Sequence, residues 1–134
     1  MTPSALLDAQ VQMKRMYNAL SEALELTRQL AEAMDRDDQV SMQMLISMRE
    51  EPVKVIRQVS LALDQQRDSM GEADQLRFSQ LLKGEPPGTP EEEPLTKQVG
   101  ANRRVLQQVQ ELDKVLNLRL AREKSIYRQE GQSS

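Results

Sequence analysis

The sequence contains no cysteine, no histidine and no tryptophan, and its aromatic residues are one phenylalanine and two tyrosines. The lack of cysteine excludes disulfide bonds, a thiolate nucleophile and a Cys-ligated metal. The lack of histidine removes the commonest general base and the commonest metal ligand. With so few aromatic side chains, stacking against nucleic-acid bases is not an expected function.

Long apolar runs are also missing, since no stretch approaches the roughly 18 residues that a bilayer requires. The N-terminal residues Met1–Ser4 lack the basic and then apolar pattern of a signal peptide. We therefore expect a cytoplasmic protein without membrane contact. Its 18 basic and 21 acidic side chains leave a formal charge of −3, which is too mild to indicate a nucleic-acid partner.

Carboxylates are the abundant groups that could perform catalysis, but they gather where other roles explain them. Asp35, Asp37 and Asp38 suit a turn and a helix cap, and Glu91–Glu93 lie in a proline-rich segment. A ferritin-type di-iron site needs Glu-x-x-His, and the sequence also lacks a glycine-rich phosphate loop. We expect no enzymatic activity, no cofactor and no metal.

The residues that are present predict a single all-α domain over residues 1–134. Residues 4–36 contain no glycine or proline and consist largely of helix-forming residues. A heptad-type stripe with alternating spacings of four and three predicts that this helix packs lengthwise on another. The stripe consists of Met13, Tyr17, Leu20, Leu24, Thr27, Ala31 and Met34.

The acidic segment Asp35–Asp38 predicts a tight turn, with an aspartate capping a second helix over residues 39–70. The two helices should then be antiparallel neighbours. Pro52 allows two readings of the second helix: a kink, or a stop near Arg49 and a restart with Pro52 in the first turn. We favour the kink, because the apolar stripe keeps its phase across the proline.

A short helix is predicted over residues 73–83, with Gly84 as its C-terminal cap. The segment 84–94 holds four of the six prolines and several glutamates, which predicts a flexible connector. A last long helix is predicted over residues 95–128, followed by a frayed end at 131–134. The expected architecture is an elongated antiparallel helical hairpin or bundle of three long helices plus one short helix. The apolar face of the last helix consists of Leu95, Val99, Leu106, Val109, Leu112, Leu116 and Leu120.

Charge is distributed unevenly along the chain. The last 39 residues carry eight basic and four acidic side chains, whereas the rest of the chain is acidic. One reading is that the basic helix lies against the acidic hairpin. The other is that the cations near the C-terminus belong to a partner site: Arg119, Arg122, Lys124 and Arg128.

The eight methionines are more than a chain of this length needs, and methionine suits surfaces that accept varied apolar helices. Met44 and Met48 lie one helical turn apart beside Leu45, where they are as well explained by a core as by a binding surface. Met42 points elsewhere and is the better candidate for an exposed contact.

Three segments resemble the flagellar export chaperones of the FlgN and FliT type. They are Leu26–Asp38, where a long helix ends in an acidic turn, Leu45–Pro52, with its Arg-Glu pair after a leucine, and Leu112–Leu120, with an asparagine between leucines. The resemblance implies a cytoplasmic chaperone that binds the helical C-terminal region of hook-associated or filament-cap proteins before export. Recognition would then be helix-in-groove, with the client completing a bundle.

Stripe geometry and this resemblance together place the partner-binding site on the last helix. The expected apolar anchors are Val109, Leu112, Leu116 and Leu120, the expected charged rim is Arg119 and Arg122, and Met42 is an additional contact. A competing interpretation is a self-associating coiled-coil protein, including a homodimer, that uses the stripe of the first helix. A third is an adaptor of another secretion system or a phage-encoded protein.

Overall fold

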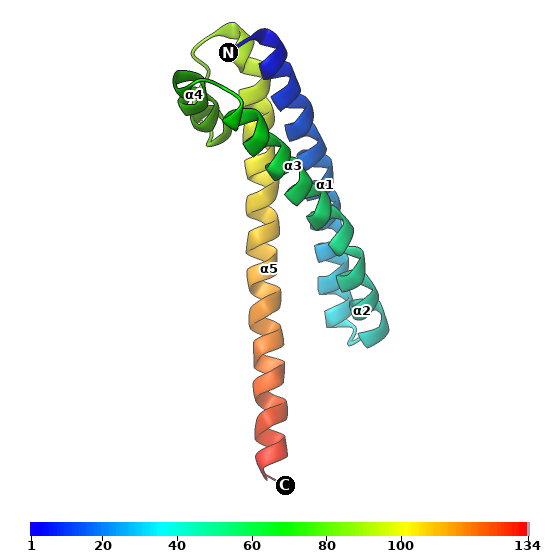
Figure 1. Ribbon diagram of the computed structural model, residues 1–134. Coiled ribbons are helices and arrows are strands. Elements are labelled where there is room, and N and C mark those ends of the chain that lie inside the picture. The colour runs from blue at the N-terminus through cyan, green and yellow to red at the C-terminus, as the bar shows by residue number, and fades with distance from the viewer. Residues whose placement is uncertain (134) are drawn as a thin grey trace.

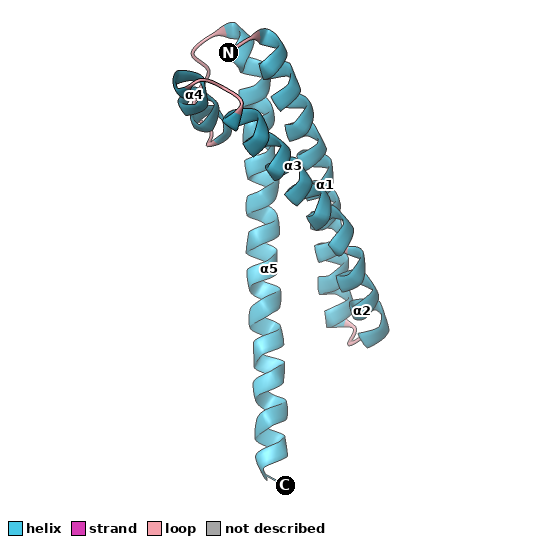
Figure 2. Cartoon of the chain, in the orientation of Figure 1, coloured by secondary structure: helices cyan, strands magenta, loops and turns pink. Residues whose placement is uncertain are grey.

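The computed structural model describes the backbone of residues 1–133 and the side chains of residues 1–122, and every element in this part of the chain is helical (Figure 2). The expected all-α class with long helices is confirmed. The elements are α1 (Pro3–Asp35), α2 (Gln39–Met48), α3 (Glu50–Asp68), α4 (Glu72–Leu82), the 3-10 turn η1 (Pro90–Glu92) and α5 (Glu93–Ser133).

The long helix α1 is the central element of the fold. The chain turns back from α1 into α2 and α3, crosses over through α4 and the connector, and then descends again in α5 (Figure 1). Helices α1 and α5 therefore run parallel, and both are antiparallel to α2 and α3. Among the described residues, α1 contacts α2, α3 and α5, but no Cα atom of α2 or α3 lies within 8 Å of one in α5.

Two apolar clusters at opposite ends of α1 form the core. The stripe predicted for the first helix lies in these clusters and between them: Met13, Leu20, Leu24, Thr27 and Met34 are buried, while Tyr17 and Ala31 are half-buried. The upper cluster joins α1 to α3, α4 and the start of α5, with Val59, Phe78, Leu81, Leu95 and Val99. The lower cluster joins α1 to α2 and the later part of α5, with Leu26, Leu30, Met42, Leu45 and Leu116.

The turn between α1 and α2 has the aspartate cap that the sequence predicts. The carboxylate of Asp38 accepts hydrogen bonds from the Ser41 backbone N–H at 3.1 Å and from the Ser41 hydroxyl at 2.6 Å. The hydroxyl bond, and then the backbone bond, lower the pKa of Asp38. Asp37 occupies the left-handed region with φ of 54°, which aspartate tolerates in tight turns.

The predicted kinked helix over residues 39–70 is instead two helices that meet at Arg49. Pro52 lacks a backbone N–H, so the carbonyl of Met48 loses its usual helical partner. The chain resolves this by restarting, with Pro52 in the first turn of α3, where proline is tolerated. The second reading of this proline is therefore the one that the structure adopts, and Pro52 is fully buried.

The boundaries of the connector and of α5 also differ from the prediction. Gly84 ends α4 with φ of +102°, as expected of a C-terminal glycine cap. The expected flexible connector over 84–94 is wrong for residues 90–94, because η1 and the first turn of α5 occupy them. Helix α5 then continues to Ser133, beyond the predicted end at Arg128 and through most of the segment expected to fray.

Candidate protein interface

Helix α5 packs on α1 through a heptad seam that includes two polar residues. Asn102 and Asp113 fill positions in the alternating four-three spacing that runs from Leu95 to Leu120. Only the apolar members of this seam were expected to form the face of the helix. The full seam is Leu95, Val99, Asn102, Leu106, Val109, Asp113, Leu116 and Leu120.

Asn102 sets the register between α5 and α1. Its side chain is 3% exposed, and its Nδ2 donates to the carbonyl oxygen of Met13 at 2.7 Å. Its Oδ1 accepts a hydrogen bond from Gln98 Nε2 at 3.0 Å. A single asparagine in an apolar seam favours the one alignment that satisfies its amide. Its place in the four-three repeat was the sequence signal for this role.

Asp113 connects α5 to the opposite side of the bundle. Both carboxylate oxygens accept from Arg49 Nη2, at 2.8 and 2.9 Å, and Arg49 lies at the junction of α2 and α3. The side chains of Arg49 and Asp113 are 24% and 33% exposed. This ion pair therefore spans the space between helices whose backbones do not approach each other.

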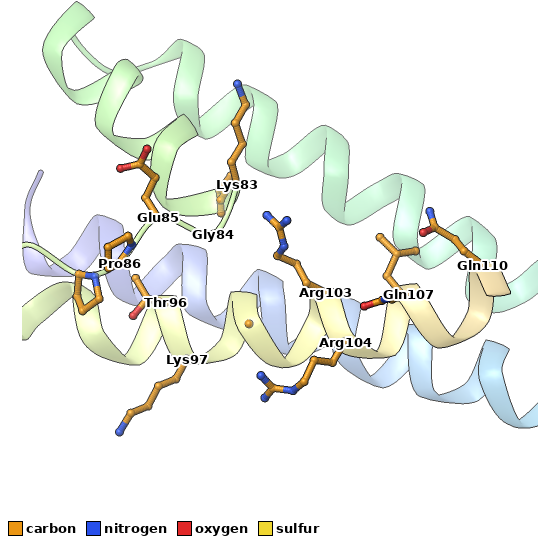
Figure 3. Close-up of a pocket in the computed structure, with 14 residues that line it drawn as sticks. Lys83, Gly84, Glu85, Pro86, Thr96, Lys97, Arg103, Arg104, Gln107 and Gln110 are labelled. Atoms are coloured by element: carbon orange, nitrogen blue, oxygen red, sulfur yellow. The ribbon is translucent and has the colours of Figure 1, made fainter.

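A groove of about 1020 Å³ lies where α4 and the connector meet the outer side of α5. In Figure 3, Arg103 and Gln110 rise from α5 toward the side of α3 and α4, whereas Lys97 and Arg104 point away. Its walls are the end of α4 with the start of the connector, residues 82–87, and the stretch of α5 from Thr96 to Gln110. Its lining includes Leu82, Lys83, Gly84, Glu85, Thr96, Arg103, Leu106, Gln107 and Gln110.

Leu106 is the apolar centre of this lining. It occupies a seam position of α5, yet its side chain is 40% exposed. Its seam neighbour Val109 is only 8% exposed. The seam consists of two rows: positions 95, 102, 109 and 116 are all buried, whereas positions 106, 113 and 120 on its other edge are exposed or half-buried.

The charges around the groove are mostly positive. Four cations line it, namely Lys83, Lys97, Arg103 and Arg104, against the single carboxylate of Glu85. Within the described residues, none of the four has a carboxylate within 4.0 Å. Arg103 lies against the backbone of Gly84, since a Cβ atom at this glycine would lie 2.7 Å from Arg103 Nη1.

The four expected apolar anchors are instead part of the chain's own core. Val109 and Leu116 are buried at 8% and 3% exposure, and Leu116 belongs to the lower cluster with residues of α1 and α2. Leu112 and Leu120 are half-buried against the same cluster. The prediction that these side chains are free to anchor a partner is therefore wrong for Val109 and Leu116, which are buried, whereas Leu112 and Leu120 remain half-buried.

The two arginines of the expected charged rim, Arg119 and Arg122, differ in their surroundings. Arg119 Nη2 lies 2.9 Å from Asp35 Oδ1 in an ion pair, so the basic last helix lies against the acidic hairpin at this point, as the first reading of the charge pattern supposes. Arg122 is exposed. The side chains of Lys124 and Arg128, which belonged to the second reading, lie outside the described residues.

Met42 of α2 has the role opposite to that expected, and Met44 and Met48, for which both readings were open, are exposed. Met42 is 7% exposed and packs in the lower cluster, while Met44 and Met48 are 55% and 48% exposed. Met42 and Leu45, three residues apart, share the face of α2 that packs on α1. The outer face of α2 presents Val40, Met44, Ile46 and Met48 to solvent.

The described part of the chain has neither a metal-ligand cluster nor a membrane-spanning helix. Its residues contain no group of three or more side chains suited to hold a metal ion. None of the helices described is both long enough and apolar enough to cross a membrane. In comparisons with known proteins, no family model, no curated protein and no solved structure matches the chain.

Proposed function

We propose that this protein is a chaperone that binds an amphipathic helix of a partner protein in the groove between α5 and residues 82–87, at the end of α4 and the start of the connector. The observation that carries the proposal is this groove of about 1020 Å³, whose lining includes the exposed Leu106 of α5. Packed helices have axes about 8–10 Å apart, so a guest helix laid along this groove would pack beside α5. It would complete a four-helix bundle.

The lining suits such a guest. Leu82 and Leu106 offer apolar contacts, and Gln107 and Gln110 flank them with polar groups. Helix-in-groove recognition combines a few apolar anchors with a polar rim in this way. The half-exposed Leu106 is the residue that we expect to dominate the affinity.

The sequence resemblance to flagellar export chaperones supplies the class of partner. We propose a cytoplasmic protein that holds the helical C-terminal region of a hook-associated or filament-cap protein before secretion. We place the partner helix in the groove, and no longer on Val109, Leu112, Leu116 and Leu120, because those residues are buried or half-buried within the chain.

A second candidate function is self-association, and the outer face of α2 favours it. Val40 is 80% exposed and Met44 is 55% exposed, one helical turn apart on a ten-residue helix. This differs from the coiled-coil interpretation of the first helix, whose stripe is used within the chain. A homodimer through α2 would leave the groove on α5 open.

Co-expression with the C-terminal regions of hook-associated and filament-cap proteins tests the first candidate. Size exclusion with light scattering should detect a one-to-one complex with one of them. Leu106→Lys should abolish the complex, whereas Val115→Lys, on an exposed position of the opposite face of α5, should leave it intact. A tight homodimer that ignores every such client and dissociates on Met44→Ser would instead support self-association.

A further inference from the structure

We infer that the helix bound in this groove carries carboxylates along the edge that faces Lys83 and Arg103, so the partner segment is an acidic amphipathic helix. This inference rests on the proposed function, and it names the chemistry by which the groove would select its guest. It begins from two cations that different elements bring to the same end of the groove.

The fold brings these cations together by a specific contact. Lys83 follows the last residue of α4, and Arg103 projects from α5. Gly84, next in the chain to Lys83, lies so close that a Cβ atom there would be 2.7 Å from Arg103 Nη1. Figure 3 shows Arg103 directed toward the end of α4, with Lys83 extending on the same side of α5.

Lys83 and Arg103 are available to an external partner, because neither is held by a carboxylate of its own chain in the described residues. Cations that join elements have close carboxylates: Arg77 lies 2.7 Å from Glu92, and Arg119 lies 2.9 Å from Asp35. Cations that border an apolar groove and lack an internal partner are suited to an external one.

The one carboxylate in the groove lining does not neutralise this end. Glu85 lies 3.9 Å from Arg77 Nη1, and Arg77 is itself held by Glu92. Lys97 and Arg104 add two more cations on the far side of α5 (Figure 3). With four cations against one carboxylate, the lining of the groove carries a net positive charge.

Two features of binding follow from this arrangement. Acidic guests should associate faster and more tightly at low salt, and the advantage should fade as salt screens the charges. A guest with basic residues on that edge should be rejected, because two like charges would meet at the groove end. The apolar contact with Leu106 should persist at every salt concentration.

Two designed helical peptides test the inference on the full chain. They share one apolar stripe, and the positions beside that stripe carry glutamate in one peptide and glutamine in the other. Fluorescence anisotropy at about 20 mM salt should show the glutamate peptide binding about tenfold more tightly, with the gap closing near 500 mM. In the double variant Lys83→Glu with Arg103→Glu, the glutamine peptide should bind more tightly instead.

The matched control reverses two exposed cations of α3, Lys54→Glu with Arg57→Glu, which gives the same net charge away from the groove. If it removes the preference as fully as the groove variant, net charge explains the binding and the inference is overturned. If both peptides bind equally at every salt concentration, the groove function stands and the acidic guest is overturned. If neither peptide binds, the proposed function fails, and the inference with it. Circular dichroism on each variant shows that loss of binding is not loss of fold.

Discussion

Glu92 is a buried carboxylate in the segment where the sequence predicts a flexible connector, and neutralising it should destabilise the protein. Its Oε1 and Oε2 accept from Arg77 at 2.7 and 3.1 Å, and Oε1 also accepts the Gly88 backbone N–H at 2.7 Å. The hydrogen bonds from Arg77 are the largest influence on the pKa of Glu92. They outweigh burial and lower the pKa from 4.5 to about 2.

The pKa change sets the magnitude of the effect. The interval between 4.5 and about 2 corresponds to about 3 kcal/mol of stability at neutral pH. The Glu92 side chain is 9% exposed but Arg77 is 28% exposed, so water screens part of this interaction. Glu92→Gln keeps the shape and the acceptor for Gly88, and we expect it to lower the free energy of unfolding by about 2 kcal/mol.

The sign of the pH dependence follows from the direction of the pKa change. Because the folded-state pKa is lower than the unfolded value, the carboxylate stabilises the fold fully above about pH 4.5. This contribution is lost as the pH falls from about 4.5 toward about 2. Urea unfolding followed by circular dichroism should therefore show that Glu92→Gln has a lower free energy of unfolding than the unsubstituted protein at pH 7. This difference should shrink markedly by about pH 3.

The adjacent exposed residue provides the control. Glu91→Gln changes the same charge without a hydrogen bond to lose, so its effect should stay within about 0.5 kcal/mol. A deficit in Glu92→Gln as small as that of Glu91→Gln at pH 7 would refute the reasoning. So would a deficit of equal size at pH 7 and at about pH 3, because it would not arise from ionisation.

Three further predictions concern the core and the ion pair between Arg49 and Asp113. Met42→Ala should lower the free energy of unfolding, measured with urea, by about 2–3 kcal/mol, and Met44→Ala should lower it by less than about 0.5 kcal/mol. Equal losses would contradict the burial of Met42 and the exposure of Met44. Leu116→Ala should lower stability by about 3 kcal/mol; a variant that stays fully stable but loses a client would restore Leu116 as a binding anchor. Asp113→Asn should cost about 1 kcal/mol at low salt and less at high salt; a salt-independent loss would show that packing dominates over the charge pair with Arg49.

Local signals in the sequence predicted most of the element boundaries. Asp38 caps α2 because a short acidic side chain can accept the first free N–H groups of a helix. Gly84 ends α4 because its positive φ is open to glycine at little cost. The stripe of α1 was also predictable, since a wide apolar face must be covered.

The sequence of a helix does not show which element covers its apolar face. The apolar face of α5 has the same appearance whether its partner is α1 or another protein, so Leu116 was assigned to a client. Met42 and Met44 are two residues apart, and Met42 is the one that shares a face of α2 with Leu45 and packs on α1. The role of Glu92 was not predicted, because Glu92 lies in a proline-rich segment. Its partner Arg77 belongs to α4, 15 residues earlier in the chain.

The parallel pairing of α1 and α5 has a consequence for how the chain acquires its structure. Asn102 reaches Met13 across 89 residues, and closing a loop of that length costs roughly 4 kcal/mol of chain entropy. The hairpin of α1 with α2 and α3 consists of nearer contacts and can form first. During synthesis, the side of α1 that α5 covers stays open until the last third of the chain has left the ribosome. For a helical protein of this size we therefore expect slow final docking, with a period in which the nascent hairpin is exposed to proteases and to other apolar helices.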